Sequence, residues 1–481
     1  MWLLSMARAA DPEAPPGKDR PVIEDCAVWG GAALSRRLDR RTDSTEVLGN
    51  QVELLVDGAE AFGRRRENVA AADLVLVKTF LWNDDAVGRE MALLLADRAR
   101  AGALVVVQYD YKANAPLSAA VGKWVLNTRE APPPPSVLLP VIAAGGLVVP
   151  TNVPNRRREI RRVVARSDGT GTNGTAAAAE RNRARGGIRE FDHEKYWITG
   201  YDRGGVVELR AILGGLNVGS EYAYGGTLYV DPATGRGGWR DTDVEVRGPL
   251  TTTLAARFYD VLALNATSLP ETLDRSRWVV EQPAAGDAAV RFVWAQPQIG
   301  RRHHVDHLYR ALIRATPVDA PLVLETAYFA PPPATFRALR EAVEDGARVS
   351  VVTNSAESVD VPFIADASGA AYNALVRAGP GVTLHHWRVR PGAETLHSKV
   401  ASFGACGPVI VGSANLDGLS TEHNSEAVVL VRDSALRAAF DVMIAGDLAS
   451  AEPFTLDDAN DIAWAVRAWQ SFVYAVGWYW L

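Results

Sequence analysis

The chain has 481 residues, of which 48% are hydrophobic and 22% are charged, and its formal net charge is −6 at pH 7. This composition excludes a disordered or fibrous chain, and the length predicts two or three domains. The negative charge argues against nucleic acid binding over the whole surface, although a local basic patch can still bind an anionic partner. Two cysteines, Cys26 and Cys406, are too few for a disulfide framework, and nothing in the sequence indicates that they meet.

The N-terminal stretch and the hydropathy of the chain bear on membrane attachment. Met1–Met6 is too short for the apolar region of a signal peptide, and no positively charged segment precedes it. No apolar run reaches the roughly eighteen residues that a spanning helix needs, so we expect none. Membrane contact would then be peripheral, and we expect it on the cytoplasmic side. Residues 1–48 are interpreted as an N-terminal extension.

Several segments of the first half of the chain recur in the same order in the second half. Each copy has an apolar strand that ends in a polar loop, then a helix, a glycine and a second strand. The pairs are Leu74–Asp85 with Leu322–Pro332, Leu93–Asp110 with Ala338–Ser355, and the segments that begin at Val141 and Leu375. This order predicts an α/β fold with two similar lobes, each a mixed β-sheet flanked by helices, at residues 49–282 and 283–452. Chance is the alternative, since helix, glycine and strand often follow one another.

Two segments fall outside this repeat. Residues 155–190 hold ten arginines against four acidic residues and predict a mobile insertion in the first lobe. We expect a solvated loop there, and a basic flap for anionic lipid headgroups is the alternative. Residues 453–481 form an aromatic tail, which suits either the wet edge of a bilayer or a final helix that caps the core. Of these two, we expect core packing.

Two histidines each precede a lysine by two positions. The chain has eight histidines and six lysines, and the only lysines after Lys123 are Lys195 and Lys399, which follow His193 and His397. About 0.1 such pairs are expected by chance in this composition, so coincidence is a poor explanation. Residues two apart on an extended strand point to the same face, so each pair presents an imidazole and an ammonium group to one ligand.

Together the two pairs suit a phosphodiester. One imidazole can attack phosphorus and the other can protonate the departing alcohol, while the two ammonium groups neutralise charge on the phosphate oxygens. This division of labour needs no metal and no cofactor. From the ordered repeats, we expect a rotation near a half turn to relate the lobes and to bring His193 and His397 together across one cleft.

The sequence around each pair resembles the phospholipase D superfamily, and in particular its cardiolipin synthases. In that family, Gly-Ser-x-Asn and Asn-x-Glu follow the second His-x-Lys, and similar residues follow the first. The matching residues here are Gly412, Ser413, Asn415, Asp417, Ser420, Asn424 and Glu426 in the second half, and Gly215, Asn217, Trp239, Arg240 and Asp241 in the first. The resemblance covers roughly Gly49 to Arg432 and implies the fold of that family, with pseudo-two-fold symmetry.

The resemblance also implies a role for each matching residue. His193 would be the nucleophile and His397 the general acid and base, with the reverse assignment as the alternative. Glu426 and Asp241 would accept a ring N–H from the histidines, or would instead form a buried ion pair with arginine. The implied phosphate contacts are Lys195, Lys399, Asn217 and Asn415, and the implied substrate-binding residues are Ser413, Gly412, Gly215 and Asn424.

Two departures from the family pattern bear on activity. Gly200 and Gly404 stand five residues after the two lysines, where the family has aspartate. Such a carboxylate would support the site rather than make or break bonds, so we expect an active enzyme. A catalytically weakened pseudoenzyme or lipid-binding scaffold of the same fold is the alternative.

The implied function is phosphatidyl transfer or phosphodiester hydrolysis on glycerophospholipids, through a phosphohistidine and at a peripheral membrane surface. A nuclease is a weaker alternative, and we expect no nucleic acid partner, because aromatic residues are not interleaved with basic ones. His303, His304 and His307 lack a carboxylate or cysteine pattern that would complete a metal site. His385 and His386 are expected to be packed or edge residues of an apolar strand, and His423 receives no role.

Overall fold

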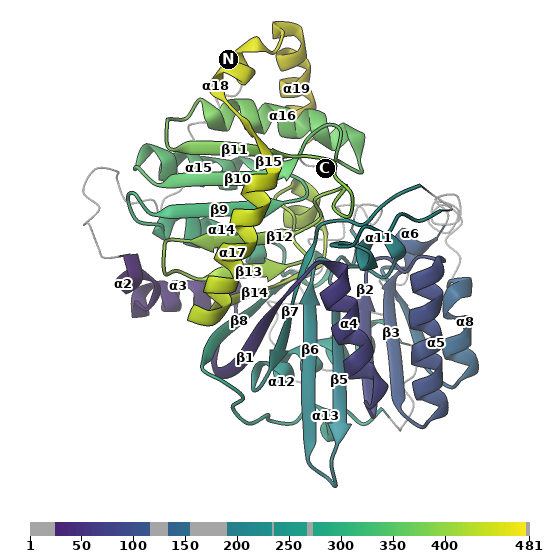
Figure 1. The fold of residues 1–481 in the computed structure, drawn as a ribbon. Coiled ribbons are helices and arrows are strands. Elements are labelled where there is room, and N and C mark those ends of the chain that lie inside the picture. Colours follow the sequence, from purple (N-terminus) through teal and green to yellow (C-terminus); the bar gives the residue numbers. More distant parts are fainter. Residues whose placement is uncertain (1–24, 116–132, 154–189, 233–234, 267–272, 478–481) are drawn as a thin grey trace.

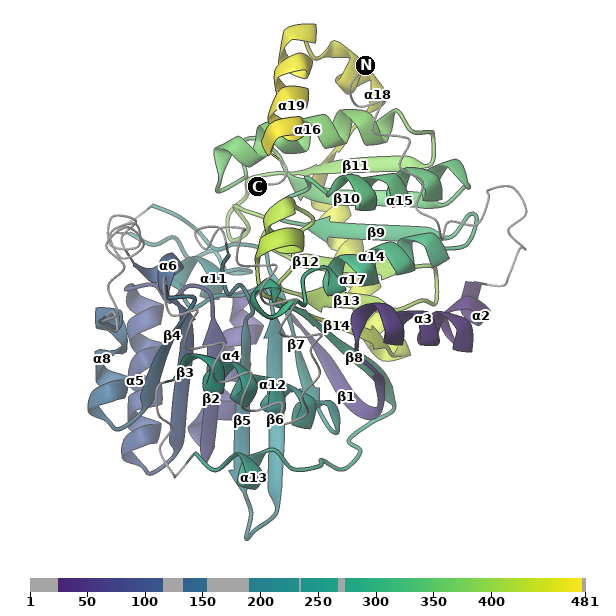
Figure 2. The ribbon, with the colours of Figure 1, turned by 180° about the vertical axis from the view of Figure 1, so that it is seen from behind.

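The structure, a computed structural model, describes residues 25–115, 133–153, 190–232, 235–266 and 273–477. They form a mixed sheet of fifteen strands in the order β15-β11-β10-β9-β12-β13-β14-β8-β1-β7-β6-β5-β2-β3-β4. The sheet runs through both halves of the molecule, and helices cover both of its faces (Figures 1 and 2). Residues 155–189 of the predicted insertion, the end of the aromatic tail at 478–481, and residues 1–24 lie outside the described residues.

The two halves of the sheet have the same strand order. In the first lobe it is β1-β7-β6-β5-β2-β3-β4, and in the second it is β8-β14-β13-β12-β9-β10-β11, with β15 at the edge. The strands of the first lobe are β1 Glu46–Val56, β2 Leu74–Thr79, β3 Leu104–Asp110, β4 Leu147–Thr151, β5 Tyr196–Asp202, β6 Val207–Gly214 and β7 Thr242–Arg247. Those of the second are β8 Ala288–Ala295, β9 Pro321–Thr326, β10 Arg348–Asn354, β11 Val382–Trp387, β12 Lys399–Phe403, β13 Val409–Gly412, β14 Glu426–Arg432 and β15 Ala451–Phe454. The predicted α/β fold with two similar lobes is confirmed.

Strands β1 and β8 join the lobes edge to edge. They pair antiparallel, with Glu46 opposite Arg291 and Asn50 opposite Ala288, and the register shifts between Val47 and Asn50. The sequence predicted one sheet in each lobe. The two are instead continuous, because β1 bonds β7 with one edge and β8 with the other. The lobe boundaries at 49–282 and 283–452 stay a prediction.

Helices flank the sheet, and a side-chain cap begins two of the long ones. Asp85 accepts a hydrogen bond from the Gly88 N–H at the start of one helix, and Asp433 accepts one from the Leu436 N–H at the start of another. The helices of ten residues or more are α3 Ala32–Thr42, α4 Asp57–Ala70, α5 Ala86–Arg100, α12 Leu250–Asn265, α14 His304–Ala315, α15 Pro333–Glu344, α16 Pro362–Val376, α17 Ser434–Ser450 and α19 Trp464–Gly477. The shorter ones are α2 Asp25–Trp29, α6 Tyr111–Asn114, α8 Leu139–Ala143, α11 Ser220–Ala223, α13 Arg275–Trp278 and α18 Leu456–Asp461.

Apolar clusters fill the space between the sheet and the helices. One packs α4 and α5 against the first lobe and contains Phe62, and another packs α14, α15 and α16 against the second and contains Leu339. A further cluster draws residues from both lobes, including Phe258 of α12 and Phe440 of α17. Burial of apolar surface stabilises a fold by roughly 25 cal/mol per Å². The shared cluster therefore holds the two lobes in one fixed arrangement.

The N-terminal helices are attached to the second lobe. Helix α3 packs against α14, and Cys26 in α2 forms a disulfide with Cys406, which lies in the loop after β12. Nothing in the sequence indicated this pairing, because 380 residues separate the two cysteines. The bond fixes the start of the described chain to the body of the protein.

The aromatic tail does not pack as the sequence predicted. In α19 the side chains of Trp464, Trp469 and Phe472 are 77%, 53% and 58% exposed, so the prediction that this helix caps the core is wrong for them. Tyr474 is buried, and its hydroxyl donates a hydrogen bond to the Pro331 carbonyl. Helix α19 lies on α16 at the far end of the second lobe (Figure 1). Within the described part of the chain, no helix is long and apolar enough to cross a membrane.

Candidate active site

Each His-x-Lys segment lies at the start of a central strand of its lobe. His193 and Lys195 lead into β5, and His397 leads into β12, which Lys399 begins. A side chain at the end of a parallel strand holds the residue before each histidine. The Asp192 N–H donates to Asp110 Oδ2 at 2.7 Å, and the Leu396 N–H donates to Asn354 Oδ1 at 3.0 Å. The two segments are therefore anchored in the same way.

Backbone hydrogen bonds connect each histidine to the other lobe. The His193 N–H donates to the Ser425 carbonyl at 2.9 Å, and the His397 N–H donates to the Arg240 carbonyl at 2.7 Å. Ser425 directly precedes Glu426, and Arg240 directly precedes Asp241. Each histidine thus lies beside the carboxylate of the opposite lobe.

The ring contacts follow from this arrangement. His193 Nδ1 lies 2.9 Å from Glu426 Oε1, and His397 Nδ1 lies 2.6 Å from Asp241 Oδ2. An ionised carboxylate can only accept, so it selects the tautomer that carries hydrogen on Nδ1 and leaves Nε2 with a lone pair. The Ser413 hydroxyl donates to Glu426 Oε2 at 2.5 Å and fixes the second oxygen. All four ring and carboxylate groups are buried.

Burial shifts the pKa values of both pairs. Desolvation lowers the pKa of His193 and lowers that of His397 well below its ordinary value, and the two lysines add to the effect. Burial raises the pKa of Asp241 to about 6, although Lys399 opposes the shift. Burial also disfavours the charged form of Glu426, but the charge and hydrogen bond of His193 outweigh it and leave the pKa of Glu426 below its usual value. The two carboxylates are therefore electrostatically different.

The lysines bring positive charge to the same place. Lys195 Nζ donates to the His193 carbonyl at 2.8 Å, and Lys399 Nζ donates to the His397 carbonyl. Burial lowers the pKa of Lys195 to about 7 and that of Lys399 to about 8, and each lowers the pKa of the other lobe's histidine. Two charged groups shift each other's pKa values clearly only when they lie within several ångströms of one another. An anion bound between the lobes would relieve the repulsion.

The two asparagines predicted to contact phosphate differ in their hydrogen bonding. Asn217 Oδ1 accepts a hydrogen bond from the Leu81 N–H at 3.1 Å. Asn415 Oδ1 is buried and has no hydrogen-bond partner in the structure. A buried polar atom without a partner is costly, so it marks a place where a ligand or water can bind. Whether either asparagine contacts phosphate stays a prediction.

The four residues predicted to bind substrate lie against the carboxylates or the sheet. A Cβ atom on Gly215 would come within 2.0 Å of Asp241 Oδ1, so only glycine leaves room for this carboxylate. Gly412 lies in β13, where a Cβ atom would come within 2.5 Å of the Ala427 carbonyl. Asn424 Nδ2 donates to Glu426 Oε1 at 3.4 Å, and Ser413 bonds the other oxygen. Gly215, Ser413 and Asn424 thus support the two carboxylates. Direct contact of the four residues with substrate stays a prediction.

Aromatic rings that the sequence analysis did not assign line the two imidazoles. The Phe80 ring lies 4.8 Å from that of His193, centroid to centroid. The rings of Tyr222 and Trp239 lie 5.2 and 5.4 Å from that of His397. Trp239 was among the residues that match the family. That match was the sequence signal for the aromatic rings beside His397. Tyr222 and Phe80 lie within the region of the resemblance, Gly49 to Arg432, but received no role.

Behind His193 is a buried charge network that the sequence analysis missed. Lys78 Nζ pairs with Asp192 at 2.7 Å, and Arg257 pairs with Glu194, the middle residue of the motif, at 2.5 Å. All four side chains are buried. A lysine within the buried strand β2 was the available signal, because a buried cation needs a partner.

Behind His397 the corresponding network has another composition. Arg240 forms three hydrogen bonds with Asp447, at 3.0, 3.1 and 2.8 Å, and lies 4.0 Å from Glu325. Burial and the Asp447 charge raise the pKa of Glu325 well above its ordinary value. The middle residue of this motif, Ser398, hydrogen-bonds Thr242 at 3.0 Å.

The two glycines that replace the family's aspartates lie away from the histidines. Gly200 is within β5, where a Cβ atom would come 2.8 Å from the Trp278 ring. It is five residues beyond Lys195, which is roughly 17 Å along a strand. Gly404 ends β12 with φ of 71°, a conformation that favours glycine. A carboxylate at Gly200 could not contact a phosphate held by Lys195.

The other histidines are placed elsewhere. In the described part of the chain, no group of three or more His, Cys, Asp or Glu residues is arranged to hold a metal ion. His303 and His307 lie near the start of α14 with ring centroids 6.0 Å apart. His385 and His386 are in β11, near the edge of the sheet, as predicted.

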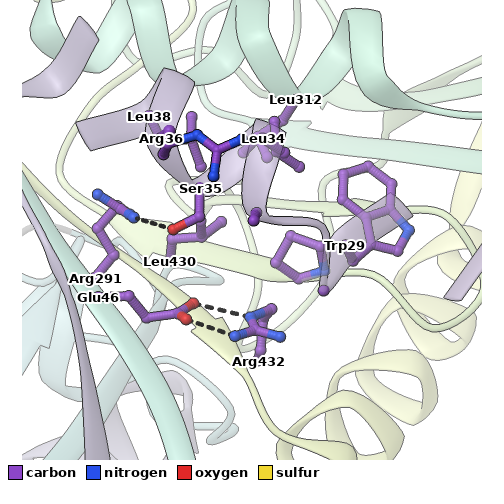
Figure 3. A pocket seen from close by; sticks show the side chains of 13 residues that line it. Trp29, Leu34, Ser35, Arg36, Leu38, Glu46, Arg291, Leu312, Leu430 and Arg432 are labelled. Carbon is purple, nitrogen blue, oxygen red and sulfur yellow. Dashed lines mark hydrogen bonds and ion pairs between the residues drawn. The ribbon is translucent and has the colours of Figure 1, made fainter. Parts of the chain in front are cut away.

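A cavity of about 300 Å³ lies beside α3, β8 and β14 and includes none of the predicted site residues (Figure 3). Within it Arg432 forms two hydrogen bonds with Glu46, at 2.8 and 2.5 Å, and Arg291 pairs with Asp39 at 2.8 Å. These charges are already compensated, so the cavity gives no evidence for a second anion site.

Known proteins share this sequence pattern and fold. The family model described as "Cardiolipin synthase, PLD-like domain" matches residues 319–447. Cardiolipin synthase A of Pseudomonas entomophila (strain L48) is 28% identical over 421 residues, which are 86% of this chain and 71% of the relative. Cardiolipin synthase B of Escherichia coli (strain K12) is 25% identical over 395 residues, which are 80% and 77% of the two chains. The chain is therefore similar to cardiolipin synthases over most of its length.

A solved structure adds evidence on the fold of this chain. The crystal structure of phosphatidylserine synthase from Haemophilus influenzae Rd KW20 superposes with a TM-score of 0.62 at 15% identity, and covers 93% of this chain and 100% of that one. The predicted resemblance to the superfamily is therefore confirmed. The matched segment 319–447 contains the second His-x-Lys pair and Glu426, while the first lobe repeats its strand order.

Proposed function

We propose that this protein is a phospholipase D-type phosphatidyl transferase or phosphodiesterase that acts on glycerophospholipids, as the names of its cardiolipin synthase relatives indicate. One observation carries the proposal. Two buried histidines, each hydrogen-bonded through Nδ1 to a carboxylate of the opposite lobe, lie with two buried lysines whose pKa values are lowered. This set provides a nucleophile, a proton carrier and positive charge for a single phosphodiester.

The proposed reaction has two displacement steps. His193 Nε2 attacks phosphorus, a P–N bond forms, and the P–O bond to the headgroup alcohol breaks while protonated His397 gives its Nε2 proton to the leaving oxygen. An incoming alcohol or water then gives its proton to His397 and forms a new P–O bond, and the P–N bond breaks. Lys195 and Lys399 would stabilise charge on the phosphate oxygens in both steps.

The lysines also account for the prediction that no metal or cofactor is needed. Lys195 and Lys399 lie in the site, and once a bound phosphate raises their pKa values they supply the charge that a divalent ion would otherwise supply. We expect turnover to survive chelation. Loss of activity in EDTA, restored by one divalent metal, would contradict this.

We further propose that the protein binds a membrane surface peripherally through α19. The helix presents Trp464, Trp469 and Phe472 to solvent, and its one charged residue is Arg467. Tryptophan and phenylalanine on one face of a surface helix favour the boundary between headgroups and acyl chains. Sedimentation with phosphatidylglycerol vesicles tests the idea. Trp469→Ser should weaken binding, and Val442→Ser, which alters an exposed residue of α17, should not.

The predicted cytoplasmic side meets one opposing observation. Disulfides persist mainly in oxidising compartments, and Cys26 is bonded to Cys406. Location stays a prediction, and labelling of thiols in intact cells would decide it.

Two other functions remain as alternatives. A scaffold without turnover was suggested by Gly200 and Gly404, but the distance of Gly200 from Lys195 weakens that reasoning. A nuclease stays the less favoured alternative, because the net charge of the chain is −6.

The direct test is incubation with phosphatidylglycerol vesicles, with and without added glycerol, followed by analysis of lipid products. We expect phosphatidyl transfer products or phosphatidic acid from the wild-type protein and neither from His193→Ala. Unchanged lipid in both samples would reject the enzyme and leave the scaffold.

A further inference from the structure

The disulfide joins two exposed parts of the molecule. Cys26 is in α2, at the periphery of the second lobe (Figure 1), and Cys406 is in the turn that connects β12 to β13. Both cysteines are exposed, so a reductant in solution can reach the bond. The chain has no other cysteine. Thiol chemistry on this protein therefore acts on this one bond.

The disulfide and the side chain of Trp29 attach α2 to the second lobe. The helix is five residues long, and so short a helix is not stable in water without tertiary contacts. Trp29 is buried, and its ring packs on that of Phe403 with the centroids 6.3 Å apart. A Cβ atom on Gly407 would come within 2.7 Å of the Trp29 ring. Helix α2 therefore lies directly on the turn that holds Cys406.

Helix α3 has attachments of its own. Leu38 is buried in the core of the second lobe, and Asp39 pairs with Arg291 of β8 at 2.8 Å. The helix also packs against α14. Opening the disulfide would therefore release α2 and leave α3 in place.

The turn that holds Cys406 ends a strand of the proposed active site. Strand β12 begins at Lys399 and ends at Phe403, directly before the turn at 404–408. This turn contains no charged side chain. The Gly404 N–H donates to the Pro321 carbonyl at 2.6 Å, and Arg437 donates to the Gly407 carbonyl at 3.2 Å. The disulfide is the one covalent attachment of this hairpin to another part of the chain.

The corresponding hairpin of the first lobe, β5–β6, is held by a charged side chain instead. The Asp202 N–H donates to Asp73 Oδ2 at 2.8 Å, and the Asp202 carboxylate pairs with Arg277 at 2.9 Å. These contacts do not depend on the redox state of the surroundings. A reductant should therefore affect the hairpin of the second lobe and leave that of the first unchanged.

We propose that the Cys26–Cys406 bond is a redox-sensitive clasp on the β12–β13 hairpin. In the oxidised protein the bond holds α2 against the turn and restricts the motion of the strand that begins with Lys399. A dithiol opens the clasp, because its two thiols pass two electrons and two protons to the protein disulfide. Cys26 and Cys406 become thiols, and the dithiol becomes a disulfide. The inference goes beyond the proposed function, since the bond restricts the second lobe whatever reaction the site performs.

Hydrogen exchange measured by mass spectrometry tests the clasp on the full chain. The wild-type protein is compared before and after treatment with dithiothreitol, and thiol titration should find no reactive thiol before the treatment and two after it. We expect the amides of residues 400–412 to exchange about tenfold faster or more in the reduced protein, because the hairpin opens more often once α2 is released. The amides of β5–β6, residues 196–214, should not change.

The matched control is the double variant Cys26→Ser, Cys406→Ser. Its residues 400–412 should exchange as fast as those of the reduced wild type and should not respond to dithiothreitol. Equal exchange of residues 400–412 in both states of the wild type would overturn the clasp, and so would two reactive thiols before treatment. Faster exchange in β5–β6 as well would also overturn it, because the bond would then stabilise the whole fold. The wild-type comparison decides these outcomes even if the double variant does not fold.

Turnover separates this inference from the proposed function. With phosphatidylglycerol vesicles, the rate should fall roughly twofold or more in the reduced wild type, because a less restricted Lys399 holds phosphate less precisely. The rate of the double variant should not respond to dithiothreitol. An equal rate in both redox states of the wild type would overturn the effect on Lys399. If neither state turns over lipid, the proposed function fails, and the exchange measurement alone judges the clasp.

Discussion

The His193 and His397 halves of the site share their backbone arrangement and differ in what surrounds the rings. In both, a hydrogen bond from the other lobe fixes the histidine N–H and a carboxylate holds Nδ1. The ring beside His193 is that of Phe80, while the rings beside His397 are those of Tyr222 and Trp239. Duplication can therefore preserve the geometry of a site while side chains divide the work between its two halves.

The buried charges behind the rings differ in the same way. The position that Lys78 occupies in β2 is occupied by Glu325 in β9, since each directly precedes the threonine that ends the strand. Lys78 has an acidic partner at 2.7 Å, whereas Glu325 is 4.0 Å from its nearest arginine nitrogen. One half thus places a paired cation where the other places a carboxyl group whose pKa burial raises well above its usual value. This asymmetry predicts different roles for the two histidines.

The largest effect should come from replacing either histidine with alanine. His193→Ala should abolish turnover of both a natural phospholipid and an activated phosphodiester, because no other side chain is proposed to form the covalent bond. His397→Ala should lose roughly 10²- to 10⁴-fold on the phospholipid and recover much of this on the activated substrate, whose leaving group needs no proton. Steady-state rates on the two substrates measure both outcomes.

Trapping the intermediate provides the counter-test of this assignment. A phosphorylated peptide that contains His397 instead of His193 would show that the roles are reversed, and rescue restricted to the His193 variant would show the same. The activated substrate must be tested at the same pH in both variants, because the two histidines have different carboxylate partners.

Replacing the carboxylates should give the next largest effect. Each replacement should affect the histidine of the opposite lobe. Glu426→Gln and Asp241→Asn should each lower kcat/KM roughly 10- to 100-fold by freeing one imidazole. By NMR titration, Glu426→Gln should further lower the pKa of His193 and leave His397 nearly unchanged, because removal of a negative charge disfavours the imidazolium. Asp241→Asn should do the reverse. Loss of both signals in one variant would indicate that the cleft had rearranged.

A smaller effect concerns protons taken up when phosphate binds. In the free protein the pKa of Lys195 is about 7 and that of Lys399 about 8, so near pH 7.5 Lys195 is mostly neutral and Lys399 mostly charged. A bound phosphate raises both values, and a base whose pKa rises takes up protons. Calorimetry with inorganic phosphate in buffers of different ionisation enthalpy should therefore show net uptake. Lys195→Met should reduce the proton uptake more than Lys399→Met. Equal reductions would show that the two lysines do not differ in protonation.

The smallest effect is expected at the two glycines. Gly200→Asp should destabilise the fold by about 1–3 kcal/mol, because the new side chain meets the Trp278 ring. Gly404→Asp should cost about 1 kcal/mol, because its backbone has a positive φ that aspartate tolerates. Urea denaturation measures both values. Neither change should raise activity, and a gain in either variant would mean that a carboxylate there supports the site after all.

The sequence analysis located much of the site because its signals are local. His193 with Lys195, and His397 with Lys399, are each two residues apart, and an extended strand turns that spacing into a shared direction. The order of strands and helices in each half also follows from patterns a few residues long, which is why the α/β fold with two lobes was predictable. The resemblance to the phospholipase D superfamily followed from the segments after each pair.

What only the tertiary structure decided is the pairing of distant residues. His397 and Asp241 are 156 residues apart, and His193 and Glu426 are 233 apart, so no local pattern shows that each carboxylate serves the opposite lobe. The same holds for Cys26 with Cys406. The exposure of α19 was also undetermined, because aromatic residues favour a core and a membrane edge alike. A single sequence specifies which side chains follow one another, whereas strand register and lobe packing determine which of them meet.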